Sequence, residues 1–408
     1  MEVTRTMKVK TLLIVVPLAC AVLLAVVWAG TVAAQEFSGL TDNEQLGKSI
    51  FFDKNLSINQ NQSCATCHDP AWGWTGPDSA INGAGSVYEG SIAGKFGDRK
   101  PPSAAYATQS PIFQVDKKGL FVGGNFWDGR ATGEALGNPA ADQALGPFLN
   151  PVEQALATPS DVVTRVCAAA YGGLFTEVWG PEVCDPGNVE DAYGKIGLSI
   201  AAYEASSEVN AFGSKYDYTF SGQAKLSKEE QRGFALFRGK GMCHRCHIGN
   251  SQGALFTDYT FDNLGVPKNP ENPVYEMLPD FIDFGLGGFL ETEGYPEDVY
   301  MAERGKHKVP TLRNVDLRPD GSSVKAYGHN GYFKTLEGIV HFYNTRDVKP
   351  VCPGPYTEAE ALAADCWPAP EVAETVNMDE LGDLGLTPQE EAAIVAFLKT
   401  LSDGHVPE

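Results

Sequence analysis

Two short cysteine clusters carry the clearest chemistry in this chain of 408 residues. Each has the form C-x-x-C-H, and the residues are Cys64, Cys67 and His68 in SCATCHD, and Cys243, Cys246 and His247 in MCHRCHI. In this motif the two thiols form thioethers with the vinyl groups of a haem, and the adjacent histidine binds the iron. A zinc site is a poorer explanation, because no further cysteine pair lies nearby to complete it. The sequence therefore predicts two covalently bound c-type haems.

The ligand opposite each histidine decides what each haem does. Between Asp69 and Gly241 the chain contains neither histidine nor methionine. Unless a tyrosine, a lysine or a distant residue binds there, the first iron is five-coordinate and open to a small oxidant. An open c-type haem favours a catalyst over a pure electron carrier.

The second haem has few nearby candidates for its other ligand. Met242 and His244 lie too close to the motif to reach the opposite face. The remaining candidates are Met277, Met301, Met378, His307, His329, His341, His405 and the tyrosines. In TLEGIVHFYN the helical spacing puts Tyr343 on the buried face and His341 away from it. That spacing alone is compatible with packing of Tyr343 as well as with iron coordination.

The same helical signal precedes both haem motifs. LTDNEQLG begins at Leu40 and LSKEEQRG at Leu226, and both read L-[ST]-x-x-E-Q-x-G. Each contains a capping box, as does the last helix, and the pairs are Thr41 with Glu44, Ser227 with Glu230, and Thr387 with Glu390. The segments between are rich in Gly and Pro. We therefore expect a mainly α protein with two cytochrome c-like haem domains, at 35–222 and 223–408, and long ordered loops.

The first 34 residues have a different character. Basic residues precede an apolar run from Thr11 to Gly30, and Val32 and Ala34 fit a signal-peptidase site. We predict a cleaved signal over residues 1–34 and a periplasmic location, with an uncleaved membrane anchor as the alternative. The formal net charge of −21 argues against a nucleic-acid partner. The oligomeric state stays open.

Export to an oxidising compartment also gives the remaining cysteines a role. Their proximity in the chain favours two disulfides that close short loops, Cys167–Cys184 and Cys352–Cys366.

Five further motifs carry a family resemblance. They are FWDGRA (126–131), QALGP (143–147), NPVEQ (150–154), VPTLRNV (309–315) and HNGYFKTLE (329–337). With these motifs the chain resembles the bacterial di-haem cytochrome c peroxidases and the related MauG proteins, over essentially the whole mature chain. The resemblance implies that His68 is the proximal ligand of the peroxidatic haem and His247 that of the electron-transfer haem.

The resemblance also assigns roles that the residues alone do not. Trp127 is expected between the haems as an electron relay, and Gln143 and Glu153 match the family's distal amide and carboxylate, with Pro147 as a wall of that pocket. A carboxylate and an amide suit peroxide cleavage, which needs a base and a fixed dipole. Without the resemblance, Trp127 reads as a packed aromatic and Glu153 as an acid at a helix start.

Two departures bear on the haem ligands. Classical members block the first haem with a histidine about ten residues before the pair that matches Pro102 and Ser103, and the stretch EGSIAGKFGDRKPPS contains no histidine. Classical members also place a methionine fourteen residues after the histidine of an HDG turn. Here the turn is HNG, and the residue fourteen positions after His329 is Tyr343. MauG has a tyrosine ligand at that position.

A third departure concerns calcium. The family's inter-haem calcium ligands align with Lys100, Val324 and Ala326. The asparagine side chain is thus lost, which makes calcium doubtful here.

The resemblance implies a peroxidase. Hydrogen peroxide is expected to react at the first haem, with electrons relayed through the second from a protein donor, a small c-type cytochrome or a cupredoxin. The other outcome is MauG-like oxidation of residues on a partner protein, which a tyrosine ligand favours. The alternative from another class is a non-enzymatic di-haem electron carrier, which predicts two six-coordinate haems that do not react with peroxide.

Overall fold

Helices and long connections make up most of the computed structural model, which describes residues 39–407. The helices are α2 (Asp42–Phe51), α3 (Cys64–Cys67), α4 (Ser79–Gly83), α5 (Pro139–Leu149), α6 (Pro159–Ala168), α7 (Gly172–Trp179), α8 (Val189–Ala205), α9 (Lys215–Phe220), α10 (Lys228–Arg238), α11 (Val274–Met277), α12 (Gly285–Thr292), α13 (Glu297–Ala302), α14 (Leu336–Thr345), α15 (Glu358–Ala363) and α16 (Pro388–Lys399). The mainly α class is thereby confirmed. The predicted signal over 1–34 lies outside the described residues.

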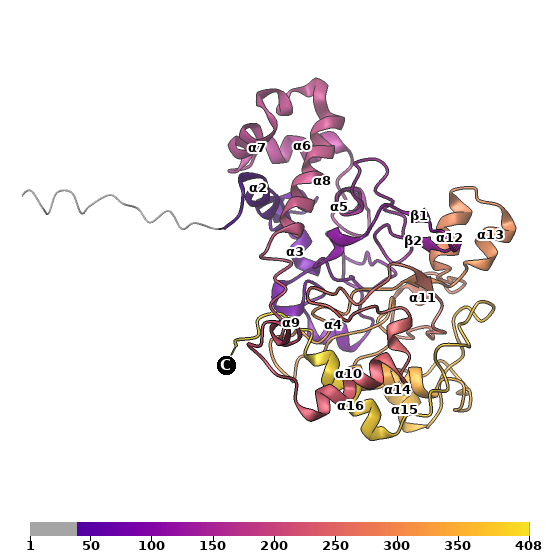
Figure 1. Ribbon diagram of the computed structural model, residues 1–408. Helices are drawn as coiled ribbons and strands as arrows, with labels where there is room; N and C mark the ends of the chain where they lie inside the picture. Colours follow the sequence, from indigo (N-terminus) through magenta and orange to yellow (C-terminus); the bar gives the residue numbers. More distant parts are fainter. Residues whose placement is uncertain (1–38, 408) are drawn as a thin grey trace, which may run out of the picture. The chain divides into compact units, whose positions relative to one another are not determined.

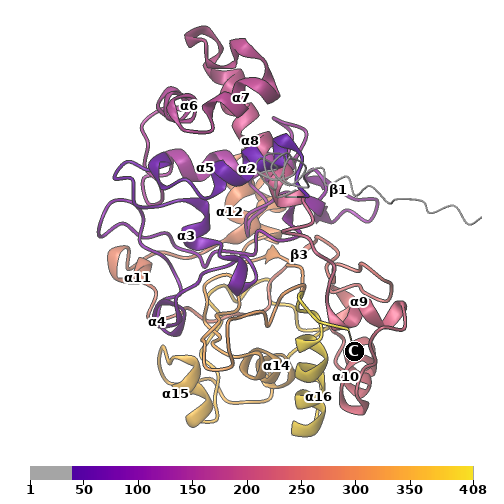
Figure 2. The ribbon, with the colours of Figure 1, turned by 90° about the vertical axis from the view of Figure 1, so that its left-hand side faces the viewer.

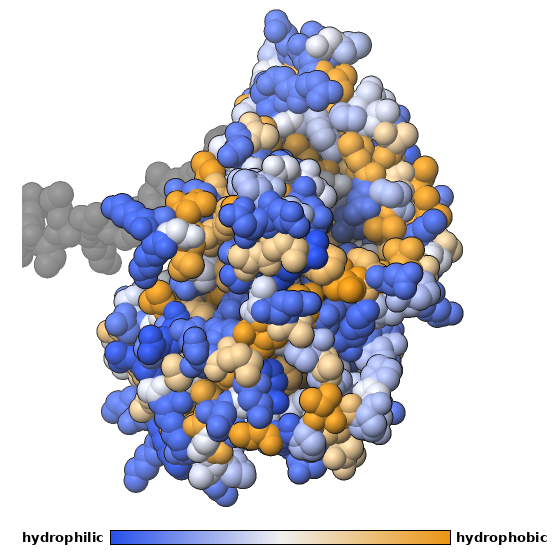
Figure 3. All heavy atoms as spheres, turned by 90° about the vertical axis from the view of Figure 1, so that its right-hand side faces the viewer, coloured by the Kyte–Doolittle hydropathy of each residue, from blue (hydrophilic) through white to orange (hydrophobic). Residues whose placement is uncertain are grey.

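The strands of the described residues are short. They form two antiparallel pairs, β1 (Gln114–Val115) with β2 (Phe121–Val122), and β3 (Phe261–Asp262) with β4 (His307–Lys308). Aromatic rings from the β1–β2 hairpin pack against Leu286 and Leu290 of α12. On the face that carries α12 and α13, hydrophobic residues form several groups separated by hydrophilic ones (Figure 3).

The described helices from 41 onwards gather in two groups. Helices α2, α5, α6, α7 and α8 lie at one end, and α9, α10, α14, α15 and α16 lie at the other (Figures 1 and 2). Residues 41–408 nevertheless cluster as one compact unit. The boundary near residue 222 stays a prediction.

The predicted helix starts are confirmed by their capping hydrogen bonds. Helices α2, α10 and α16 each begin with a reciprocal capping box at the predicted Thr or Ser and Glu. These boxes satisfy backbone N–H groups that the first helical turn leaves without partners.

The repeat glycine sets one close helix crossing in each group. Gly47 of α2 meets α8, and Gly233 of α10 meets α16. A Cβ at either glycine would overlap a backbone carbonyl of the crossing helix, that of Ser199 or that of Ala393. Only glycine lets the backbones approach this closely, so the glycine that ends each repeat fixes a helix crossing beside each haem motif.

Both predicted disulfides are present. Cys167–Cys184 joins α6 to the turn after α7, and Cys352–Cys366 brackets α15. Within the described part of the chain, no helix has the length and apolar character that a bilayer crossing requires.

Candidate haem and peroxide site

One cavity of about 420 Å³ brings the predicted site residues together. Its lining includes residues from both cysteine clusters and from the distal motifs, namely Cys67, His68, Trp127, Gln143, Pro147, Glu153, Cys243, Cys246, His247 and Tyr343. These residues come from positions up to 276 apart in the chain, counted from Cys67 to Tyr343. The fold therefore brings into one cavity residues that belong to separate motifs in the sequence.

The first motif presents its histidine in the orientation that an iron ligand needs. Cys64 and Cys67 form α3, and the Nδ1 atom of His68 lies 3.1 Å from the carbonyl oxygen of Trp74. Because a carbonyl only accepts, Nδ1 carries the proton and Nε2 keeps its lone pair. Burial lowers the pKa of His68, which keeps the ring neutral.

The second motif repeats this geometry. The Nδ1 atom of His247 lies 2.8 Å from the carbonyl oxygen of Phe256, and burial again lowers the pKa of the imidazole. Cys243 and Cys246 are free thiols, as are the two cysteines of the first motif. Two pairs of free cysteines, each beside a buried histidine whose Nδ1 is held by a backbone carbonyl, fit two covalently attached haems.

The distal residues of the first haem lie on α5 and in the turn after it. Gln143 and Pro147 belong to α5, and Glu153 follows in a turn where Gln154 N donates to Pro147 O at 3.1 Å. The backbone of Glu153 is held at both ends, because its N–H donates to Asn150 O and its carbonyl accepts from Ser91 N. The interpretation of Glu153 as a helix-start acid was wrong, since the chain turns here instead of starting a helix.

Burial sets the acidity of this carboxyl group. Burial raises the pKa of Glu153, and the charge of Arg130 partly opposes the increase. A carboxyl whose pKa is raised toward neutrality is suited to accept a proton and return it.

A second buried carboxyl lines the same cavity, and sequence reasoning missed it. Glu204 of α8 is 4% exposed, and burial raises its pKa to about 8. It is close enough to Cys64 to raise the pKa of that thiol. In the sequence AAYEASS nothing distinguishes Glu204 from a solvated helical acid, so no local signal could have found it.

Tyr343 lies where the helical spacing predicted. It projects from α14 into the cavity that His247 also lines, and burial, with the nearby Cys243, raises the pKa of its phenol. His341 points away, with Nδ1 3.0 Å from a carboxylate oxygen of Glu391. The location of Tyr343 agrees with the prediction, and its binding to iron stays a prediction.

Trp127 is 9% exposed and lines the same cavity as both histidines. Its Nε1–H donates to the carbonyl oxygen of Lys100 at 2.8 Å, which fixes the plane of the indole. The neighbouring Asp128 accepts from Arg99 at 2.6 Å and from Arg130 at 2.7 Å. The tryptophan is therefore held rigidly in place, as an electron relay requires.

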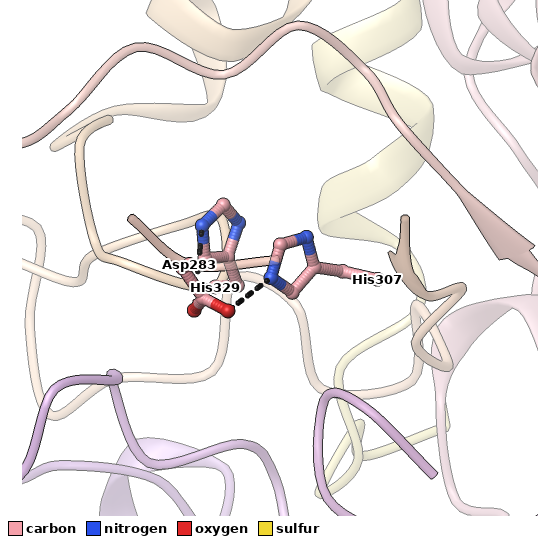
Figure 4. Close-up of side chains that lie close together, drawn as sticks. All are labelled: Asp283, His307 and His329. Atoms are coloured by element: carbon pink, nitrogen blue, oxygen red, sulfur yellow. Dashed lines mark ion pairs between the residues drawn. The ribbon is translucent and has the colours of Figure 1, made fainter. Parts of the chain in front are cut away.

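Arg99 links this region to a cluster that sequence reasoning did not find. Its guanidinium binds both oxygens of Asp283 at 2.7 Å, and His307 Nε2 lies 3.3 Å from the same carboxylate. The rings of His307 and His329 stack beside it with centroids 3.5 Å apart (Figure 4). Although burial raises the pKa of Asp283, Arg99 holds it well below its usual value. Since Arg99 takes both oxygens, we assign no metal ion to this cluster.

Comparison with known proteins places this site in a family. A family model described as di-haem cytochrome c peroxidase matches residues 41–225. The methylamine utilization protein MauG of Paracoccus denitrificans (strain Pd 1222) is 35% identical over 365 residues, which cover 88% of each protein. The chain belongs to the di-haem cytochrome c peroxidase and MauG family.

Other family members agree with this assignment. The cytochrome-c peroxidase IdrP2 of Pseudomonas sp. (strain SCT) is 27% identical over 364 residues, or 88% of this chain and 80% of that protein. The diheme peroxidase BthA of Burkholderia thailandensis E264 has a crystal structure that matches this one with a TM-score of 0.75 and 29% identity, covering 89% of this chain and 86% of that one. The predictions of a haem peroxidase and of two covalent c-type haems are confirmed.

At the position where the resemblance expects a calcium-binding asparagine this chain has Lys100, and a second buried amine, that of Lys325, lies nearby. Lys100 Nζ donates to Thr75 Oγ1 at 3.1 Å and to Pro101 O at 3.0 Å. Lys325 Nζ donates to the carbonyl oxygens of Trp72, Asn314 and Leu317 at 2.7–3.0 Å. Calcium requires oxygen ligands, and here the two amino groups occupy the nearby oxygens as hydrogen-bond donors. The donor set at this position therefore does not fit a calcium ion.

Proposed function

We propose that this protein is a periplasmic di-haem peroxidase that reduces hydrogen peroxide at the haem of His68. The observation that carries the proposal is that Glu153 and Gln143 line the same cavity as His68. The segment between Asp69 and Gly241 offers no histidine or methionine to close the position opposite His68. A base and an amide beside an open position are the parts that peroxide cleavage needs.

The overall reaction consumes two electrons and two protons, and it converts one hydrogen peroxide into two water molecules. The haems supply the electrons when they are bound. Glu153 takes a proton from one oxygen of the peroxide. It returns this proton to the other oxygen, which leaves as water. Gln143 holds the peroxide by its amide dipole, and Pro147 closes the pocket against additional water.

Tyr343 is proposed as the second ligand of the haem of His247. A phenolate is a hard anion that stabilises oxidised iron, whereas a methionine thioether stabilises the reduced state. With both haems bound, Trp127 would pass electrons between them, because it lines the same cavity as both histidines. This ligand favours an enzyme that stores oxidising power.

Two kinds of electron source follow from this chemistry. One is a small c-type cytochrome or cupredoxin, in keeping with the relatives named cytochrome-c peroxidase. The other is a partner protein oxidised at its own residues, in keeping with the 35% identity to MauG. The proposed tyrosine ligand favours the second.

The periplasmic location rests on the sequence of residues 1–34. The two disulfides support it, because such bonds persist in oxidising compartments. Covalent attachment of haem to reduced cysteine pairs is consistent with four free thiols at the two motifs.

The tyrosine is tested by the matched variants Tyr343→Phe and His341→Phe. Both residues lie on α14, but only Tyr343 lines the cavity. If Tyr343 binds iron, its replacement changes the absorption and EPR spectra of one haem and lowers the yield of oxidised partner, whereas His341→Phe leaves both spectra as they are. Unchanged spectra in Tyr343→Phe would remove the tyrosine from the mechanism.

The peroxidase proposal is tested by peroxide consumption with a reduced c-type cytochrome or cupredoxin as donor. A variant with Cys64 and Cys67 replaced by Ala, which cannot attach the first haem, is expected to lose the activity. A non-enzymatic electron carrier would instead exchange electrons with the donor and leave the peroxide concentration constant.

A further inference from the structure

The two helix crossings carry two matching groups of three aromatic rings. In each group one ring lies a turn after the crossing glycine, one belongs to the loop that holds the haem-binding histidine, and one lies on the second helix of the crossing. The groups are Phe51, Trp74 and Tyr203, and Phe237, Phe256 and Phe397. Ring centroids are 5.6–6.0 Å apart in the first group and 5.2–6.0 Å in the second, edge to face throughout.

The match extends to the haem-binding histidines. The carbonyl oxygen of Trp74 accepts from His68 Nδ1, and that of Phe256 accepts from His247 Nδ1. Both residues have left-handed backbone conformations, with φ of 63° for Trp74 and 53° for Phe256. The two groups are therefore equivalent in position, and packing alone is satisfied by three phenylalanines.

The groups differ in their redox chemistry. Indole and phenol rings lose one electron far more readily than a phenyl ring does. Trp74 and Tyr203 thus place two oxidisable rings, with centroids 6.0 Å apart, beside the peroxidatic haem site. Each stands where the second group has phenylalanine.

A carboxyl group, that of Glu208, lies near the phenol of Tyr203. Burial, together with the carboxylates of Glu208 and Glu204, raises the pKa of its phenol, so the ring is protonated before oxidation. Lys48 lies 6.0 Å from the centre of the Tyr203 ring and pairs with Glu208 at 2.6 Å. The side chains of Lys48 and Glu208 are each 36% exposed, so this pair lies at the surface.

The second group has no comparable arrangement. Tyr216 packs on Phe256 with ring centroids 5.1 Å apart, but its buried hydroxyl has no hydrogen-bond partner among the described residues. A phenol loses an electron easily only where its proton also has an acceptor. The group with two oxidisable rings therefore lies beside the proposed peroxidatic haem site, and the group of three phenylalanines lies beside the other haem site.

We propose that Trp74 and Tyr203 form an electron-transfer route between the protein surface at Glu208 and the peroxidatic haem site. The route is separate from Trp127 and rests on the proposed function, which supplies the oxidant. An electron passes from Trp74 through the His68 hydrogen bond to the oxidised site, and an electron from Tyr203 refills Trp74. The phenol proton of Tyr203 passes to Glu208. A one-electron donor at the surface then returns an electron to Tyr203, and Glu208 returns the proton.

The test uses the haem-loaded protein and one equivalent of hydrogen peroxide without a donor. The variants Trp74→Phe and Tyr203→Phe convert the first group toward the second, which shows that phenylalanine packs in this arrangement. Tyr193→Phe is the control, because Tyr193 lies on the same helix, α8, and its hydroxyl donates to Leu145 O outside the aromatic group. EPR with ring-deuterated tyrosine and mass spectrometry of oxidised peptides are the readouts.

In the native protein we expect a tyrosyl signal and oxidation products at Tyr203. Both are lost in Tyr203→Phe and in Trp74→Phe, and both persist in Tyr193→Phe. In Glu208→Gln the tyrosyl signal forms more slowly. A peroxide-dependent change in the haem spectrum with no radical or product at either residue overturns this route and leaves the proposed function intact. No change in the haem spectrum overturns both.

Discussion

Replacement of Glu153 by Gln isolates the proton transfer in peroxide cleavage. The substitution keeps the size of the side chain and its capacity for hydrogen bonds, and the backbone of this turn is held by bonds to Asn150 and Ser91. The cavity should therefore keep its shape while losing the base. Gln143 cannot replace that base, because an amide does not accept a proton at these pH values.

The expected magnitude follows from the role of the carboxylate. A positioned general base contributes about 10²–10⁴-fold to a rate, so the reaction of peroxide with the ferric protein should slow by that factor. This corresponds to about 3–5 kcal/mol of transition-state stabilisation. The effect should appear in the bimolecular rate constant measured by stopped-flow absorption.

The pH dependence provides a second, independent signature. Glu153 must be ionised to accept a proton, so the rate should rise as pH increases through its pKa. Because burial raises that pKa, the rise should occur above the pH range of an ordinary glutamate. In Glu153→Gln the rise should disappear.

Glu204 gives the discriminating comparison, because it is a buried carboxyl of the same cavity whose pKa burial raises to about 8. The assignment of Glu153 as the base is refuted if Glu153→Gln reacts at the native rate with the native pH profile. It is equally refuted if Glu204→Gln, and not Glu153→Gln, abolishes the rise with pH.

Three further predictions concern stability, each measured by thermal unfolding. Gly47→Ala should destabilise the fold by about 1–3 kcal/mol, because its methyl group overlaps a backbone carbonyl of α8. Gly83→Ala should leave the stability unchanged, because the space around Gly83 is open. Equal effects of the two substitutions would contradict the helix crossing. Replacing Cys167 and Cys184 together by Ala should cost about 3 kcal/mol for a loop of this length, and an unchanged midpoint would contradict this cross-link. Chelation with EDTA should leave the midpoint unchanged, and a decrease with EDTA alone would indicate a metal. Lys325→Met should destabilise the fold by about 1–3 kcal/mol, because it leaves buried carbonyls unpaired.

Local patterns account for what the sequence predicted well. A capping box involves residues three positions apart, so the starts of α2, α10 and α16 could be predicted without knowledge of the fold. Helical spacing likewise put Tyr343 on the buried face of its helix and His341 away from it, and Tyr343 lines the cavity in the structure. The repeated glycine was visible in the sequence, but its reason, the crossing with a helix about 150 residues later, was not.

Contacts between distant segments account for what was missed. Arg99 binds Asp283 across 184 positions, and neither residue belongs to a recognisable motif. The turn that places Glu153 in the cavity depends on backbone bonds back to α5, so its sequence alone suggested a helix start. Glu204 becomes distinctive only through the burial that the fold imposes.

The most direct measurement is the absorption and EPR spectrum of the oxidised protein, isolated without reductant, before and after one equivalent of hydrogen peroxide. An open position at the first haem predicts a high-spin component that peroxide converts without prior reduction. Ligation of the second haem by both His247 and Tyr343 predicts a low-spin component at the start. Two low-spin haems whose spectra do not respond to peroxide would contradict the proposed peroxidase.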